Sequence, residues 1–144
     1  MYDNNNMESK EISIERYFVN KASFARNLDF YGDTKQFKIS PRFYRQITKD
    51  SEELYTVTIG VNIDGKAEET PLPFCVEVEV GGVFRLTNIS EEEKKKALCA
   101  NASFILFPYI RAIVSSIMSV SGVSPIILPV MNVNRLFAEQ EKED

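Results

Sequence analysis

The stretch 104–137, FILFPYIRAIVSSIMSVSGVSPIILPVMNVNRLF, constrains the fold of this chain more than any other. Its first half predicts a helix over 104–120, because apolar residues recur at steps of three and four. A helix that is apolar on so many sides requires more than one neighbour. Two compatible interpretations follow: it covers a sheet as a core helix, and part of its apolar stripe lies at a subunit interface. The positions proposed for that interface are Ile110, Ile113, Val114 and Ile117.

Local signals set the ends of the predicted helices. Asn101 or Ser103 is expected to cap the long helix, Pro108 falls in its first turn, and Gly122 ends it in a left-handed conformation. Further on, a short amphipathic helix is predicted, with Asn132 or Asn134 as its cap and with Leu136 and Phe137 on its apolar side.

A membrane span is not expected in this stretch. About 17 mostly apolar residues, interrupted by Arg111 and by serines, fall below the roughly 20 residues that a span requires. The N-terminus also lacks a basic segment followed by an apolar core and a cleavage signature. The sequence therefore predicts a cytoplasmic protein with no membrane partner.

Residues 54–64 and 74–80 alternate apolar with polar side chains, which predicts two strands with one core face and one wet face. Asp64 and Gly65 begin a turn between them, so the two strands form a hairpin. The pair Gly81 and Gly82 is expected to break the second strand.

Two further strands are predicted before this hairpin. Residues 12–19 alternate at first and then run Tyr-Phe-Val, which indicates a bulge or burial on both faces. Residues 20–35 are expected to form a loop that carries aromatic side chains. A strand near 36–47 contains Pro41, which predicts an edge position or a bulge.

The segment 90–98 predicts a short solvated helix. Ser90 with Glu93 three residues later forms a capping signal, and EEEKKK places acids at the positive end of the helix dipole and lysines at the negative end.

Composition sets the class of protein. With 144 residues, 44% of them hydrophobic, the chain suits one domain over 11–138, between a flexible arm at 1–10 and an acidic tail at 139–144. A net charge of −4 without a basic run argues against nucleic acid. Two cysteines, Cys75 and Cys99, and no histidine leave no set of metal ligands, so reduced thiols and no metal are expected.

Catalysis is not expected from this sequence. It holds no histidine, no G-x-S-x-G, no GK[ST] phosphate loop and no dinucleotide glycine fingerprint. Glu77 and Glu79 share one face of a strand and could carry acid and base roles, but such pairs are far more often a solvated sheet face. We therefore expect a binding protein that is not an enzyme and has no cofactor.

Two motifs carry a resemblance to a known family. The run Ile-Leu-Phe-Pro-Tyr-Ile-Arg at 105–111 with the Pro-rich connector, and Gly-Gly-Val-Phe at 81–84, resemble the SecB family of protein-export chaperones. The resemblance covers roughly 12–138. It implies an α+β fold in which a four-stranded antiparallel sheet is covered by one long and one short helix. It also implies a homo-oligomer, a dimer of dimers, that holds unfolded or precursor polypeptides without ATP.

The family resemblance also implies roles for particular residues. Polypeptide-binding grooves would be lined by Phe18, Phe24, Ile39, Phe43, Leu136 and Phe137. Acids on the outer sheet face dock the zinc-bearing tail of the motor SecA in this family, a role that Glu77 and Glu79 fit. Lys21 and Ala25 stand where further acids are expected, so SecA is doubtful as a partner. An alternative is a SecB-like adaptor or a toxin-antitoxin-associated chaperone with one dedicated partner.

Overall fold

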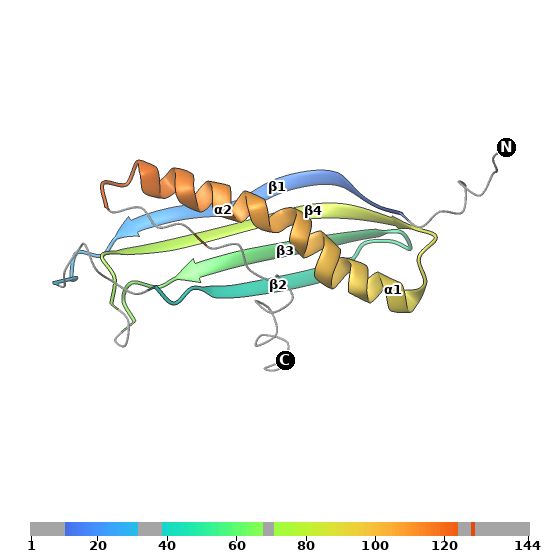
Figure 1. Ribbon diagram of the computed structural model, residues 1–144, viewed down its shortest axis with the longest axis horizontal. Helices are drawn as coiled ribbons and strands as arrows, with labels where there is room; N and C mark the ends of the chain where they lie inside the picture. The colour runs from blue at the N-terminus through green and yellow to red at the C-terminus, as the bar shows by residue number, and fades with distance from the viewer. Residues whose placement is uncertain (1–10, 32–38, 68–70, 124–127, 129–144) are drawn as a thin grey trace.

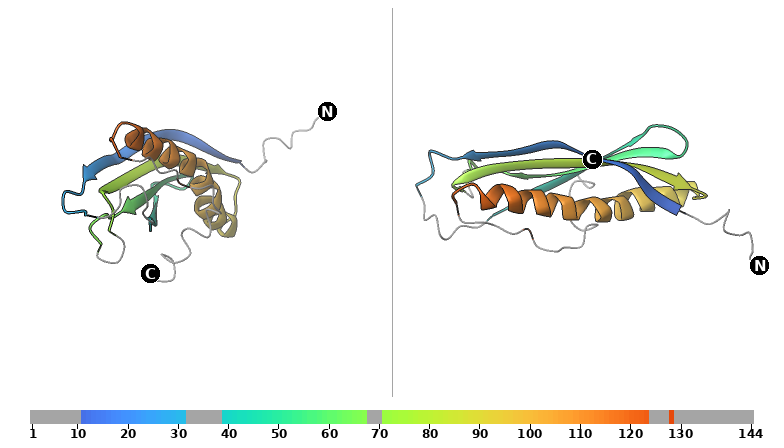
Figure 2. Two further views of the ribbon diagram at one scale, coloured as in Figure 1. Left: turned by 60° about the vertical axis from the view of Figure 1, so that its left-hand side comes forward. Right: turned by 90° about the horizontal axis from the view of Figure 1, so that it is seen from above.

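The computed structural model describes residues 11–31, 39–67, 71–123 and 128. They form one antiparallel sheet of four strands, in the order β1-β4-β3-β2, with a long helix lying across one face (Figure 1). Seen from above, helix and sheet are two layers, and the described part of the chain places no helix on the opposite face (Figure 2). The predicted α+β fold with a four-stranded antiparallel sheet is confirmed. The predicted short helix near residue 132 lies outside the described residues.

The centre of the sheet is formed by β3, Leu54–Ile63, and β4, Phe74–Thr87. They pair antiparallel from Leu54 with Arg85 to Ile63 with Val76, so the predicted hairpin is confirmed. Alternate side chains face the helix, and this period of two makes one face of each strand a core face. The wholly or almost wholly buried ones are Val57, Ile59, Val61 and Ile63 on β3, and Phe74, Val76, Val78, Val80, Phe84 and Leu86 on β4.

One edge of the sheet is β2, Arg42–Lys49. It begins directly after Pro41, because proline cannot donate to the ladder. The predicted edge position is confirmed, but the strand starts later than the expected 36–47.

The other edge is β1, Glu11–Arg26, a strand of 16 residues. Its register to β4 shifts between Ile14 and Arg16 and again between Val19 and Lys21, so the predicted bulging is confirmed. Burial on both faces is not observed, since no position of β1 is fully buried.

Two predicted chain breaks were wrong. Residues 20–26 are not loop, because they continue β1 and pair with β4 as far as Phe74. Gly81 and Gly82 do not end β4, which continues to Thr87. A Cβ at Gly81 would overlap the ring of Phe18 from β1, so the missing side chain makes room for a neighbouring one.

The helix is continuous from Glu91 to Ser119, a length of 29 residues. It consists of α1, Glu91–Lys96, a π-helical segment η2, Ala97–Ala102, and α2, Ser103–Ser119. The predicted separation into a charged helix and an apolar one was wrong, because residues 96, 97, 102 and 103 all keep helical dihedrals. Neither Asn101 nor Ser103 therefore caps a helix, and Pro108 lies inside α2.

The two ends of the helix follow the sequence signals. At the N-terminus, Ser90 Oγ accepts a hydrogen bond from the backbone N–H of Glu93 at 3.2 Å, and α1 buries no residue. At the C-terminus, α2 ends at Ser119, and Gly122 has a φ of +85°. The predicted cap, the solvated α1 and the left-handed glycine are all confirmed.

The length argument against a membrane span was wrong. In the described residues, the helix from Glu91 to Ser119 is long and apolar enough to cross a membrane, with 44% of its apolar window buried inside the protein. Core helices pass the same test. This helix lies along the sheet (Figure 2), and Leu106, Ile110 and Val114 are wholly buried there.

We expect Gly81→Val to lower the free energy of unfolding by about 1–3 kcal/mol, because the new side chain would overlap the Phe18 ring and Thr58. Urea unfolding followed by circular dichroism measures the loss. The double variant Phe18→Ala/Gly81→Val is expected to recover part of it, because it removes the ring that causes the overlap. A Gly81→Val protein as stable as the parent would contradict this explanation.

Candidate functional site

The inner face of the sheet is only partly covered at the β2 edge. Phe43 is half-buried, and its ring centroid lies 5.8 Å from that of Phe107 on α2. Ile39, just before β2, is also half-buried against the core, and Ile47 on β2 remains 36% exposed. In the described residues β2 pairs only with β3, so its other main-chain edge is open. Apolar side chains therefore lie beside a strand edge that pairs with no second strand in the described part of the chain.

The inner face is also only partly covered at β1. The ring of Tyr17 stacks on that of Tyr109 of α2, with centroids 4.1 Å apart. Ile14 and Val19, on the same side of β1, are 39% and 47% exposed. Burial and the neighbouring Tyr109 raise the pKa of Tyr17 above its ordinary value. These side chains form an apolar strip along the β1 edge.

The outer face carries Glu77 and Glu79, as the alternation of β4 predicted. Both carboxylates bind side chains of the same chain. Lys21 Nζ of β1 lies 2.6 Å from Glu77 Oε1. Asn20 Nδ2 donates to Glu79 Oε2 at 2.6 Å, and Tyr44 Oη of β2 donates to Glu79 Oε1 at 2.8 Å.

Tyr44 is strongly affected by this arrangement. Burial, the hydrogen bond to Glu79 and the charges of both glutamates hold its pKa far above the ordinary value. The phenol therefore stays protonated and keeps donating to Glu79.

Two aromatic rings cover glycines on the outer face. Tyr44 lies over Gly60, and Phe18 lies over Gly81, each ring occupying the space of the missing Cβ. The guanidinium carbon of Arg16 is 5.6 Å from the centroid of the Phe18 ring. Phe18 therefore lies on the face opposite to the helix, packed within the sheet surface.

The structure separates the residues predicted to bind polypeptide. Ile39 and Phe43 lie together at the β2 edge. Phe24 lies at the other edge, on β1, where its ring stacks on Phe74 at 6.0 Å. Phe18 is on the outer face. Leu136 and Phe137 lie outside the described residues.

The helix positions predicted at a subunit interface also divide into two pairs. Ile110 and Val114 are wholly buried within this chain, so they face the sheet and not a partner's surface. Ile113 and Ile117 are half-buried at the side of that core. Phe104 and Val120, which the periodicity did not single out as surface positions, are 70% and 84% exposed. Helical periodicity reveals an apolar stripe, but not which part of it the sheet covers.

Sequence reasoning missed the exposed apolar residues of β1 and β2. Ile14 and Val19 were predicted to lie in a strand, but neither was assigned to a face of the sheet, because the two bulges of β1 interrupt the period of two. Ile47 fell within the predicted strand 36–47 but was not named among its apolar positions. Tyr109 was noted only as part of the 105–111 run, and its stack on Tyr17 depends on tertiary structure.

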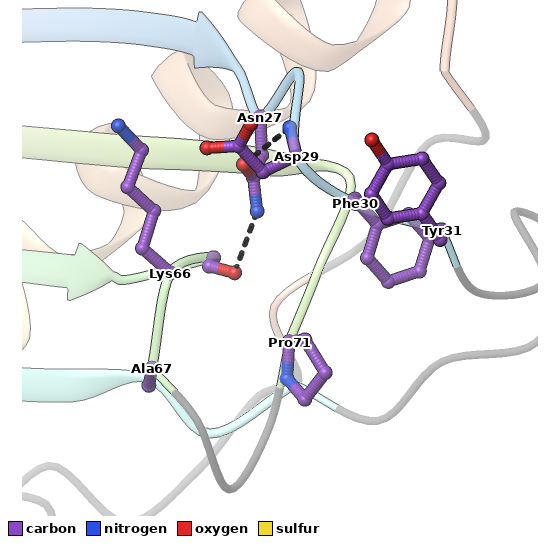
Figure 3. Close-up of a pocket in the computed structure, with 8 residues that line it drawn as sticks. Asn27, Asp29, Phe30, Tyr31, Lys66, Ala67 and Pro71 are labelled. Atoms are coloured by element: carbon purple, nitrogen blue, oxygen red, sulfur yellow. Dashed lines mark hydrogen bonds between the residues drawn. The ribbon is translucent and has the colours of Figure 1, made fainter.

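A cavity of about 440 Å³ opens where the loop after β1 meets the loop between β3 and β4 (Figure 3). Asn27, only 7% exposed, joins the two loops: its Nδ2 donates to Gly65 O and Leu72 O, both at 2.9 Å. Phe30, Tyr31 and Pro71 form the apolar part of the lining. The buried amide of Asn27 is used to hold the loops and is not available to a ligand.

Neither catalytic nor metal chemistry is indicated in the described part of the chain. No group of three His, Cys, Asp or Glu is placed to hold a metal ion there. Cys75 and Cys99 are free thiols. The arrangement supports contact with apolar or extended chains at the two sheet edges.

Comparison with known proteins agrees with this architecture. Residues 5–144 match the family model described as preprotein translocase subunit SecB. The chain is 31% identical over 133 residues to a protein-export protein SecB of Azoarcus sp. strain BH72, covering 90% of this chain and 87% of that one. It is 32% identical to the protein of the same name from Orientia tsutsugamushi strain Boryong, covering 82% and 76%.

A solved structure shares the fold. It is the Mycobacterium tuberculosis Rv1957 SecB-like chaperone in complex with a ChAD peptide from the HigA1 antitoxin, with a TM-score of 0.65 at 17% identity over 83% of this chain and 90% of that one. The family match spans nearly the whole chain, and the fold agrees with it. The chain therefore belongs to the SecB family of preprotein translocase subunits.

Proposed function

We propose that this protein is an ATP-independent holdase that binds unfolded or precursor polypeptides at apolar grooves. The observation that carries the proposal is the β2 edge, where half-buried Ile39 and Phe43 and exposed Ile47 lie beside a strand edge that has no second strand partner among the described residues. An extended chain can add backbone hydrogen bonds to such an edge and place alternate side chains on the apolar surface. The family and the names of its relatives support the same function.

Such binding requires no energy source. Its driving force is removal of apolar surface from water, and its selectivity for unfolded chains comes from their exposed backbone and side chains. The sequence contains no phosphate-binding loop. We place this activity in one domain, 11–138, of a cytoplasmic protein that is not an enzyme.

We expect the protein to suppress aggregation of a chemically denatured client at a stoichiometric ratio, with no effect of added ATP. Ile47→Asp is expected to weaken this protection several-fold, because it places a charge on the inner apolar face of β2. Gln46→Asp is the matched control, since Gln46 is exposed and points to the outer face of the same strand. Light scattering during client dilution measures both. No suppression by the parent protein, or equal loss in both variants, would contradict the proposal.

We also propose that the protein is a homo-oligomer, a dimer of dimers, in which part of α2 contacts another copy. The sheet leaves apolar side chains of the helix uncovered: Phe104 is 70% exposed, and Val120, the C-cap residue of α2, is 84% exposed. Ile117 and Ile113 are half-buried and lie about one and two helical turns before Val120.

Multi-angle light scattering is expected to give a mass well above the 16.4 kDa of one chain. Ile113→Asp is expected to reduce that mass while helical circular dichroism is retained. Ile110→Asp, at a wholly buried position, is expected to unfold the chain instead. A parent mass equal to one chain would refute the oligomer.

One observation favours a second function: Glu77 and Glu79 are both bound by other side chains of this chain. A SecB-like adaptor or toxin-antitoxin-associated chaperone serves one dedicated partner and needs no acidic surface for SecA. The related fold with a bound antitoxin peptide shows that a SecB-like chaperone can hold such a segment. Affinity capture separates the two functions: many unrelated unfolded chains support the holdase, and one dominant partner supports the adaptor.

We expect weak, salt-sensitive binding, or none, to the isolated zinc-bearing tail of SecA. Lys21 forms an ion pair with Glu77, and both Lys21 and Ala25 stand where acids are expected from the family resemblance. A charge at the rim of an interface typically contributes under about 1 kcal/mol, so these two differences together lower the affinity for the SecA tail about tenfold. Lys21→Ala is expected to strengthen binding because it releases Glu77. Titration calorimetry at low and moderate salt measures this. Sub-micromolar affinity of the parent at moderate salt would show that Lys21 has no such effect.

A further inference from the structure

A row of three residues crosses the outer face of the sheet. Tyr44 of β2 pairs with Gly60 of β3, and Gly60 pairs with Glu79 of β4, so the three lie in one line across neighbouring strands. The backbones at Tyr44 and Glu79 are therefore two strand spacings apart, about 10 Å. The ring of Tyr44 crosses the middle strand at Gly60, because the missing Cβ leaves the space that the ring fills.

Glu79 joins both edge strands, β1 and β2, to β4 (Figure 1). Tyr44 Oη donates to Oε1 at 2.8 Å from β2, and Asn20 Nδ2 donates to Oε2 at 2.6 Å from β1. Asn20 is the extra residue of the second bulge of β1, between Val19 and Lys21 in the register with β4. Hydrogen bonds to a carboxylate are stronger than those between neutral groups. One carboxylate therefore connects three strands on the face opposite to the helix.

The edge strand β2 is held on both faces near its start. On the inner side, the ring of Phe43 packs against that of Phe107 of α2. On the outer side, Tyr44 donates its hydrogen bond across β3. The second half of the strand, residues 46–49, is exposed. The direction in which Ile47 points is therefore set by the start of the strand and by the ladder with β3.

We propose that Tyr44 is a positioning residue for client binding, which fixes the rotation of the β2 edge through its bond to Glu79. This role rests on the holdase function proposed above. Without the bond, the outer face of β2 loses its link to β4, and the strand can turn about its ladder to β3. With the bond, Phe43 and Ile47 are already placed on the inner apolar side when a client arrives. A surface that is ordered in advance loses less entropy on binding.

Tyr44→Phe tests this role with the smallest change, because it removes the hydroxyl and leaves the ring over Gly60. Amides of residues 42–49 are expected to exchange about tenfold faster, the effect of losing a hydrogen bond to a charged acceptor, while β3 and β4 keep their protection. Tyr31→Phe is the matched control: it removes the same atom from a side chain that is 93% exposed, and no strand is expected to change. Native hydrogen exchange followed by mass spectrometry measures both variants.

Client binding is measured on the same proteins with reduced, carboxymethylated lysozyme, a permanently unfolded chain. Tyr44→Phe is expected to bind it about fivefold more weakly. Gly60→Ala is expected to act in the same direction, because its new methyl group displaces the ring of Tyr44 from Glu79. In the Ile47→Asp background, Tyr44→Phe is expected to add no further loss, since both changes act on the inner side of β2. A purely structural role of Tyr44 would add its loss in that background as well.

Two results would overturn the role of Tyr44: equal binding of the unfolded client by the parent and by Tyr44→Phe, or loss of protection in all four strands together. A parent protein that does not bind the client would instead refute the holdase. The exchange rates of residues 42–49 require no client, so they still decide whether Tyr44 fixes the β2 edge.

Discussion

Burial of the inner face of β4 and β3 beneath one helix is the interaction on which the rest of the structure depends. A helix with its side chains is about 10 Å wide, whereas four strands about 4.8 Å apart span more than that. One helix can therefore cover the two central strands but not both edges. This is why β4 and β3 hold most of the wholly buried side chains while β1 and β2 keep half-buried ones. The partly exposed apolar side chains at the two edges follow from the width of the covering helix.

The sequence predicted best the elements whose local pattern and tertiary role agree. β3 and the first half of β4 alternate regularly, and the long apolar stripe identified the covering helix. Prediction failed where a contact with a residue distant in the sequence changes the structural role of a residue. Gly81 was taken as a break because glycine weakens strands, but here it makes room for Phe18 from β1. In β1, which has 16 residues, two bulges interrupt the alternation of inward and outward side chains, and the positions of these bulges follow only from the pairing with β4.

The candidate site shows the same division. Glu77 and Glu79 could be assigned to one strand face from alternation alone. Their pairing with Lys21 and with Asn20 depends on the register after the second bulge of β1, and the bond from Tyr44 comes from the far edge of the sheet. In the fold, Glu77 is thus paired with a cation, and Glu79 keeps its charge but accepts hydrogen bonds from two neutral side chains. The apolar stripe of α2 was equally ambiguous, since Ile110 and Val114 belong to the core and Ile113 and Ile117 lie at its side.

The single helix combines two kinds of attachment to the sheet. Along α2 the apolar layer fixes the height and rotation of the helix over the sheet. Along α1 no residue is buried, and Lys94 contacts Glu52 O and the ring of Tyr55. The π-helical segment η2 lies between these two parts and combines both kinds of contact. Ala97, Leu98 and Ala102 are buried in the core, and Arg45 Nη1 donates to Cys99 O.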